Sequence, residues 1–493
     1  MSSSVPIIDH INCIASRIMK SNTVPLIIDG NDIVLHDEKS IFVSNPDSGR
    51  GSQWKAQGAT PELCKRALES SAAAFPKWRK SSVRERQVLF QRAVELLKER
   101  ASELSSIVAQ ELGCSSVWAS INFHATLEII EQVTALITSG ILSGQIPETE
   151  SPDSLALVFK DPIGVVLGIA PWNAPAMLGM RSIAAAVAAG NCAILKGSEL
   201  SPRTHYFIVN LFRDAGFPPG VVNFLVHKPE DASDTFTTLI SHPSVRKCNF
   251  TGSTAVGRHI ASQAGHFLKP VLLELGGKNF SLVLEDADLE TTASTILDAA
   301  FINSGQICMA TDIVLVPRKL KSAFCSLVRQ RLESTSAIQV KHVINRRSTT
   351  RILGLLDDAA RKGATVITAS SLDGEHGPLY GTVIEGLTQD MEFWHNEAFG
   401  PVVGIATYDT VDEAVEMVNG CEYGLSGAIY TASSLQAVPL ARRLDSGAVH
   451  INGPTFHDGF TLPHGGHKNS GFGRFGSHWA FEEFLHTKTV IAN

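Results

Sequence analysis

The sequence has few of the features that bind a metal, a membrane or a nucleic acid. Its eight cysteines are scattered over 493 residues, with no CxxC pair and no close group of cysteine and histidine. Neither a zinc site nor a disulfide framework is therefore indicated. No apolar run reaches the ~20 residues that a membrane-spanning helix needs. The net charge is −7 and no long basic run occurs, which argues against a nucleic-acid partner.

Scattered cysteines favour a reducing compartment, and we expect a cytoplasmic protein. The first twenty residues contain Arg17 and Lys20 but also Asp9, and they lack the apolar core of a secretion signal. A mitochondrial presequence stays open as the alternative. The chain is 44% hydrophobic and 18% charged, which is typical of a globular protein. Its length predicts about three domains.

Strand-like and helix-like segments alternate along most of the chain. From Thr60 the pattern is helical as far as residue 112, with Thr60 as a capping residue and Pro61 in the first turn. Further helices are predicted at 183–189 and 293–303. Strands are predicted at 26–28, 165–170, 192–195, 221–226, up to 250, 280–284, 313–317, 402–407, 426–430 and 448–451. This alternation predicts an α/β fold with mostly parallel, doubly wound sheets, and its restart after Lys278 predicts a second α/β domain.

Three polar side chains in separate turns suit chemistry at a carbonyl carbon. Cys308 follows Gly305 in a run without charge, Glu274 precedes two glycines, and Asn173 lies between two prolines. A thiol nucleophile, a carboxylate base and an amide donor are the groups such chemistry needs. Each has a structural alternative. Cys308 can be an inert buried thiol, Glu274 can pair with a lysine, and Asn173 can cap a helix.

The order of these motifs resembles the aldehyde dehydrogenase superfamily. The segments that carry the resemblance are Pro171-Trp172-Asn173-Ala174-Pro175, Glu274-Leu275-Gly276-Gly277-Lys278 and Gly305-Gln306-Ile307-Cys308-Met309-Ala310. It extends from about Leu26 to the C-terminus. It implies two Rossmann-like domains with a small β oligomerisation flap, in a homodimer or homotetramer. The implied division is 1–143 and 162–275 for NAD binding, 276–452 for catalysis, 144–161 and 477–493 for the flap, and 453–476 for a loop segment returning past the active site.

The resemblance also implies a mechanism. The Cys308 thiolate attacks the aldehyde, and the side chain of Asn173 with the Cys308 backbone N–H holds the oxyanion. One such donor is worth about 3–4 kcal/mol of barrier. After hydride transfer a thioester remains, and water activated by Glu274 hydrolyses it to the acid.

The implied cofactor is NAD, with NADP as a possibility. The turn at 250–257 follows a strand and opens a helix, where a pyrophosphate can bind. A carboxylate at Glu199 favours NAD, because it would repel a ribose 2′-phosphate. The residues that the resemblance assigns to the cofactor are Ile169, Pro171, Trp172, Lys196, Ser198, Glu199, Gly252, Ser253, Val256, Leu275, Gly276, Glu397 and Phe399.

The residues near Cys308 and Asn173 indicate the class of the substrate. An apolar wall suits an aromatic aldehyde, and the segments 452–458 and 470–476 resemble the salicylaldehyde, benzaldehyde and vanillin dehydrogenase branch. The predicted pocket residues are Ala174, Met177, Arg181, Ile307, Met309, Phe456, Phe460 and His464. Arg181 can meet a polar group of the substrate or form a salt bridge inside the fold.

Three residues depart from the family pattern. His464 and His467 stand where aromatic or aliphatic residues are usual, and Phe475 stands where many relatives carry a glutamate. Three alternatives stay open: oxidation of an aliphatic aldehyde, transfer of the acyl group to a thiol such as coenzyme A, and a non-catalytic protein of the same fold. Glu274 argues against acyl transfer to a thiol, because a carboxylate that activates water favours hydrolysis.

Overall fold

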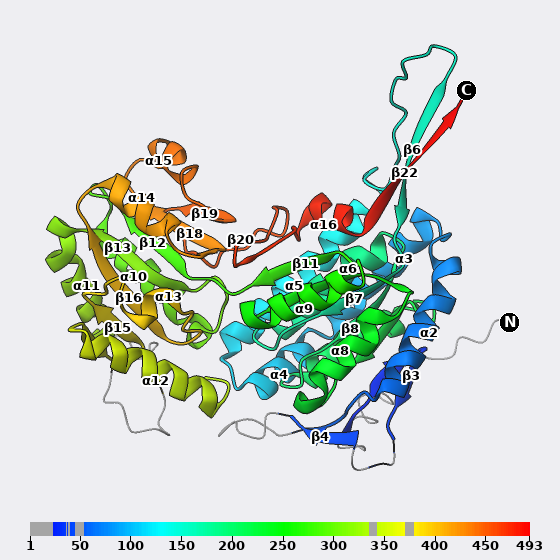
Figure 1. The fold of residues 1–493 in the computed structure, drawn as a ribbon. Helices are drawn as coiled ribbons and strands as arrows, with labels where there is room; N and C mark the ends of the chain where they lie inside the picture. The colour runs from blue at the N-terminus through cyan, green and yellow to red at the C-terminus, as the bar shows by residue number, and fades with distance from the viewer. Residues whose placement is uncertain (1–22, 36, 38–39, 45–53, 335–342, 370–378) are drawn as a thin grey trace.

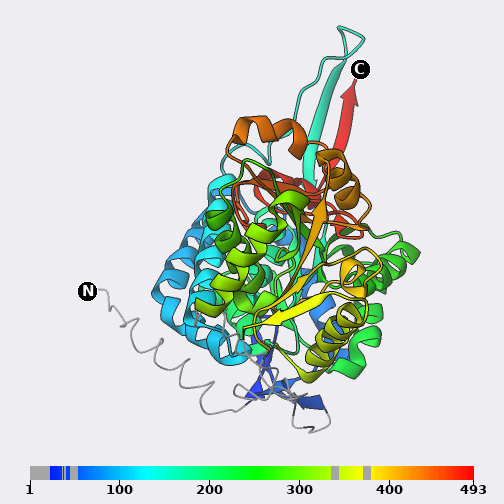
Figure 2. The same ribbon diagram turned by 90° about the vertical axis from the view of Figure 1, so that its left-hand side faces the viewer.

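The computed structural model describes residues 23–493 apart from 36, 38–39, 45–53, 335–342 and 370–378. The segment in which a presequence was considered lies outside these residues. Two α/β lobes lie side by side, and a two-stranded ribbon projects beyond them (Figures 1 and 2). The predicted fold class, two doubly wound domains, is confirmed.

The first lobe is built on an eight-stranded sheet of order β21-β11-β10-β7-β8-β9-β2-β3. The five strands from β11 to β9 are parallel, and β2 and β21 pair antiparallel at their flanks. The strands are β2 Leu26–Ile28, β3 Asn31–Ile33, β7 Val165–Ile169, β8 Cys192–Lys196, β9 Val222–Leu225, β10 Val245–Gly252, β11 Val271–Leu275 and β21 Gly471–Phe472. The helices are α2 Pro61–Trp78, α3 Val83–Glu99, α4 Ala101–Leu112, α5 Ser116–Leu136, α6 Pro175–Ala188, α7 Pro202–Asp214, α8 Ala232–Ser241, α9 Thr254–His266 and α16 Ser477–Glu483.

The second lobe holds a seven-stranded sheet of order β14-β15-β16-β13-β12-β18-β19. All neighbours are parallel except β14 and β15. The strands are β12 Asn279–Val283, β13 Thr311–Pro317, β14 Thr365–Thr368, β15 Thr382–Glu385, β16 Val402–Tyr408, β18 Ser426–Tyr430 and β19 Ala448–Ile451. The helices are α10 Leu289–Phe301, α11 Lys321–Ser334, α12 Arg346–Arg361, α13 Glu392–His395, α14 Val411–Asn419 and α15 Ser434–Ala441. After β19 the chain crosses back to the first lobe (Figure 1).

Smaller elements complete the fold. They are the sheet of β1 Thr23–Val24, β5 Lys55–Gln57 and β4 Ile41–Val43, and the pair β17 Tyr423–Gly424 with β20 His467–Lys468. The projecting ribbon pairs β6 Leu155–Pro162 with β22 Leu485–Ala492 in antiparallel register. Residues 477–483, at the start of the second predicted flap segment, form α16. This helix buries Ala480 and Phe481 in the core of the first lobe, so the second strand of the ribbon begins only at Leu485.

Local sequence explains several element boundaries. Asp29 and Gly30 both have positive φ (54° and 73°), which suits the tight turn between β2 and β3. The Thr60 hydroxyl accepts from the Leu63 N–H at 3.3 Å and caps α2 as predicted. The helical stretch at 83–112 breaks at Arg100, whose guanidinium binds Glu103 and Asp214. Among the described residues no helix is long and apolar enough to cross a membrane.

Candidate active site

Cys308 lies in a turn that begins with unusual backbone geometry. Helix α10 ends at Phe301, and the next turn holds Asn303, Ser304 and Gly305 at φ of 48°, 62° and 67°. Left-handed conformations cost energy for residues other than glycine and often occur at functional sites. At Gly305 a side chain has no room, since an added Cβ would collide with the carbonyl oxygen of Gly400. The turn is therefore held against the loop that follows α13.

Asn173 is held in place from three sides. Its side-chain Nδ2 donates to the backbone oxygen of Gln306 at 3.1 Å. Its own backbone oxygen accepts from Trp118 Nε1 at 3.0 Å and from Asn303 Nδ2 at 3.4 Å. The side chain does not cap α6, which begins after Ala174 without a side-chain cap. The amide is thus fixed beside the cysteine turn, and its Nδ2 carries a second hydrogen.

Glu274 lies near the end of β11 and is 1% exposed. Neither of its carboxylate oxygens has a hydrogen-bond partner among the described residues. It is not paired with a lysine, because Lys278 Nζ binds Asp312 at 3.1 Å and the Asn396 carbonyl at 2.8 Å. A buried carboxylate without partners is costly, which is typical of a group kept for function rather than stability.

The three residues share one cleft between the lobes. Asn173, Glu274 and Cys308 all line a cavity of about 670 Å³. Burial, followed by the nearby Glu274 carboxylate and by Glu397, raises the pKa of the Cys308 thiol well above its usual range. In this arrangement the thiol is protonated at neutral pH, and a carboxylate able to accept its proton lies beside it.

The same cleft extends along the ends of the parallel strands of the first lobe. Its lining includes the predicted cofactor residues Pro171, Trp172, Gly252, Ser253, Gly276, Glu397 and Phe399. Ser253 caps α9, accepting from the Val256 N–H at 3.5 Å, so the first turn of α9 opens onto the cleft. This cradle fits a dinucleotide phosphate, which favours a helix N-terminus after a strand.

Glu397 reaches the glycine pair that follows Glu274. The Gly277 N–H donates to its Oε1 at 3.3 Å, and an added Cβ at Gly276 would lie 2.5 Å from its Oε2. Burial, and then Asp312, raises the pKa of Glu397 to about 8. Phe399 meets Trp172 edge to face across the cleft, with ring centroids 5.7 Å apart. Glycine at 276 thus leaves the space that the Glu397 carboxylate occupies.

Known proteins are similar to this chain over nearly its full length. The sequence profile of the aldehyde dehydrogenase family matches residues 34–490. The chain belongs to the aldehyde dehydrogenase family. It is 38% identical to a vanillin dehydrogenase of Pseudomonas sp. (strain HR199 / DSM 7063) over 94% of this chain and 96% of that one.

Two further relatives extend the comparison. A benzaldehyde dehydrogenase [NAD(+)] of Pseudomonas putida is 33% identical, over 86% of this chain and 87% of the relative. The crystal structure of a salicylaldehyde dehydrogenase from Pseudomonas putida G7, complexed with salicylaldehyde, matches with a TM-score of 0.91 and 30% identity, over 96% of this chain and 98% of that one. The predicted resemblance to this family and branch is confirmed.

The other predicted cofactor residues do not line the cleft in this structure. Ile169 and Leu275 are buried last residues of β7 and β11. Lys196 ends β8, and burial lowers its pKa although Glu199 opposes the shift. Ser198 donates to Glu199 at 3.4 Å, and Val256 is exposed on the first turn of α9.

An apolar cluster packs around the cysteine turn. It contains the predicted residues Ala174, Ile307 and Met309, with Met177 and Phe456 packed against it. Three further members of this cluster were not predicted from the sequence: Trp118, Leu178 and Leu425. Trp118 comes from α5 in a separate part of the chain, and only its indole contact with Asn173 reveals its place.

The remaining predicted pocket residues lie together in a different place. Arg181 forms an ion pair with Asp458, which is the salt-bridge alternative considered above. The Arg181 guanidinium also lies 5.8 Å from the centre of the Phe460 ring. These residues border a small cavity of about 30 Å³ together with His464 and Phe475. His464 therefore lies with Arg181 and Asp458 and is not part of the apolar cluster around the cysteine turn. Its ring also lies 3.7 Å from the Glu274 carboxylate.

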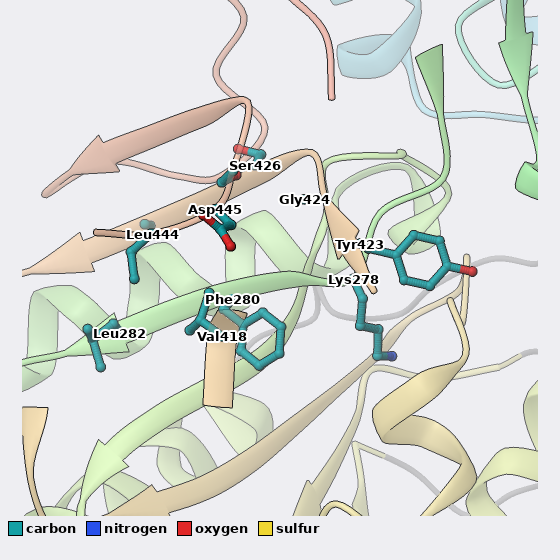
Figure 3. Close-up of a pocket in the computed structure, with 12 residues that line it drawn as sticks. Lys278, Phe280, Leu282, Val418, Tyr423, Gly424, Ser426, Leu444 and Asp445 are labelled. Carbon is teal, nitrogen blue, oxygen red and sulfur yellow. The ribbon is translucent and has the colours of Figure 1, made fainter. Parts of the chain in front are cut away.

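A further hollow lies in the second lobe beside β12 and β18 (Figure 3). Its volume of about 10 Å³ is too small for a ligand. Lys278 is on its edge, but the Lys278 Nζ is already bound as described. We assign this hollow no function.

Proposed function

We propose that this member of the aldehyde dehydrogenase family oxidises an aromatic aldehyde to its carboxylic acid with NAD. The observation that carries the proposal is the convergence of Asn173, Glu274 and Cys308 in one cleft beside a helix N-terminus that suits a dinucleotide. Relatives that act on vanillin, benzaldehyde and salicylaldehyde support the aromatic class. So does the wall with Trp118 and Phe456, because aromatic and aliphatic side chains bind flat apolar rings well.

In the first half-reaction Glu274 accepts the Cys308 proton, and the sulfur bonds to the aldehyde carbon. The oxygen of the substrate becomes an oxyanion, which the Asn173 amide stabilises. The bound NAD⁺ supplies the acceptor for the hydride of the aldehyde carbon. A thioester on Cys308 remains, while the proton taken from the thiol is still on Glu274.

In the second half-reaction Glu274 acts as a base toward water. Once Glu274 has lost its first proton, it accepts one from water, whose oxygen bonds to the thioester carbon. The C–S bond breaks and the acid leaves, which regenerates the Cys308 thiolate. A general base of this kind contributes about 10²–10⁴-fold. One proton must therefore leave Glu274 in each turnover.

We propose that NAD binds beside Lys196 and Glu199 at the end of β8. There the Glu199 carboxylate disfavours the extra phosphate of NADP. The ribbon β6–β22 supports assembly into a homodimer or homotetramer, because Phe159 and Ile491 are 45% and 60% exposed on it. A cytoplasmic location stays part of the proposal.

The test is NADH formation by the purified protein with benzaldehyde, salicylaldehyde, vanillin and hexanal. We expect aromatic aldehydes to react with higher kcat/KM than hexanal, and Cys308→Ala to abolish the signal. Cys325→Ala is the matched control, because Cys325 is a buried thiol in the second lobe, away from the cleft. A preference for hexanal would contradict the substrate class. Activity that survives in Cys308→Ala would contradict the mechanism.

A further inference from the structure

His464 faces the general base without touching it. Its Nε2 lies 3.7 Å from Glu274 Oε1. This nitrogen and both Glu274 oxygens are buried and lack a hydrogen-bond partner among the described residues. The gap is about 1 Å longer than a direct hydrogen bond of about 2.8 Å. A small rotation of either side chain brings them into direct contact.

The other nitrogen of the ring is oriented by a carboxylate. His464 Nδ1 lies 3.4 Å from Asp458 Oδ1, and Asp458 in turn pairs with Arg181. Burial alone would raise the pKa of Asp458, but Arg181 and His464 outweigh it and hold this pKa below its usual range. An ionised Asp458 favours the tautomer with the hydrogen on Nδ1, in which Nε2 presents its lone pair to Glu274.

Two main-chain hydrogen bonds fix the segment that carries the His464 ring. The His464 N–H donates to the Phe475 carbonyl at 2.9 Å, and the Phe475 N–H returns a bond to His464 at 2.8 Å. The cavity of about 30 Å³ next to Arg181, Asp458 and His464 is large enough for a water molecule. No group of three or more His, Cys, Asp or Glu within the described residues is arranged to hold a metal.

We propose that His464, oriented by Asp458 and Arg181, takes the proton from Glu274 between the two half-reactions. The proposal rests on the proposed function, which requires one proton to leave Glu274 in each turnover. The O–H bond of protonated Glu274 breaks and an N–H bond forms at His464 Nε2. The imidazolium then passes the proton to water in the cavity. The charges of Glu274, Asp458, His464 and Arg181 sum to zero both before and after the transfer, so the step adds no net charge to the buried site. His450 and His457 are further titratable groups near Asp458.

The first experiment uses 4-nitrophenyl acetate without cofactor, since this ester can acylate Cys308 directly. His464→Gln should keep the initial burst of nitrophenolate, because Glu274 accepts the first proton unaided. Its steady-state rate should fall at least about tenfold, a part of the general-base contribution. His467→Gln is the matched control, a nearby exposed histidine that should leave both phases unchanged. An unchanged steady-state rate in His464→Gln would overturn the proposal.

The second experiment separates proton transfer from a structural role. Added imidazole should restore NADH turnover to His464→Ala with benzaldehyde, but not to Glu274→Gln. Mass spectrometry should find the acyl group on Cys308 accumulating in His464→Ala. A His464→Ala protein that loses its burst and is not restored by imidazole would show that the ring only supports the fold.

Asp458→Asn gives an independent answer if the His464 variants do not fold. It should slow the steady state without reducing the burst, and an unchanged steady state would count against the relay. If the wild-type protein hydrolyses the ester but forms no NADH with any aldehyde, the proposed function is wrong. The steady-state rates of ester hydrolysis in the variants then test the proton transfer to His464 by themselves.

Discussion

Removing the amide of Asn173 tests the oxyanion site most directly. Its side chain is fixed by the bond to the Gln306 carbonyl, and its backbone by bonds from Trp118 and Asn303. The amide therefore needs no reorganisation when charge develops on the substrate oxygen. For such a preorganised donor we expect Asn173→Ala to slow acylation by about 10²–10³-fold, equivalent to about 3–4 kcal/mol.

The assay is the rate of the first NADH burst with benzaldehyde, because this phase contains only acylation and hydride transfer. Trp118→Phe is the graded companion, since it keeps the ring but removes the indole donor to the Asn173 carbonyl. It should slow the burst less than Asn173→Ala does. A burst rate in Asn173→Ala within about threefold of wild type, with normal folding by circular dichroism, would refute the assignment of Asn173.

Three further predictions concern the cofactor and the thiol. Glu199→Gln should raise kcat/KM for NADP about fivefold, because it removes about 1 kcal/mol of repulsion between the carboxylate and the 2′-phosphate, two charges roughly 4 Å apart in water. An equal kcat/KM for NADP in the wild type and the variant would contradict the placement of Glu199. Gly276→Ala should raise KM for NAD, because its Cβ would displace the Glu397 carboxylate, whereas Gly354→Ala, with no atom within 4 Å of its added Cβ, should leave KM unchanged. The rate of Cys308 alkylation by iodoacetamide should still rise with pH above about 9.5, where an unperturbed thiol with a pKa of about 8.5 is almost fully ionised, because burial and Glu274 raise the Cys308 pKa. Glu274→Gln should move this pH profile to lower pH, and an unmoved profile would be inconsistent with that cause.

Motifs with a local cause could be predicted from the sequence. The cap at Thr60, the strands with continuous apolar runs and the turn at Asn173 all depend on neighbouring residues, and the structure places them where expected. The break at Arg100 was missed, because both sides of it have helical periodicity, and the ion pair of Arg100 with the distant Asp214 has no signal in the sequence.

The environment of the site depends on residues far apart in the sequence. Trp118 reaches Asn173 across 55 positions, and Asp458 reaches Arg181 across 277. Arg181 was expected near the substrate as one of two alternatives, but only the folded chain reveals that Asp458 is its partner. His464 was recognised as an unusual residue, while its position between two carboxylates follows from the course of the chain after β19.

The contact between Gly305 and Gly400 has a consequence for protein engineering. It joins the turn that carries the nucleophile to the loop that carries Glu397 and Phe399, with no space for even a methyl group between them. Substitutions that move the loop to accommodate another cofactor will therefore also move Cys308 relative to the aldehyde. Cofactor preference and substrate turnover in this enzyme should then change together, and a library designed to alter one of them should vary both regions.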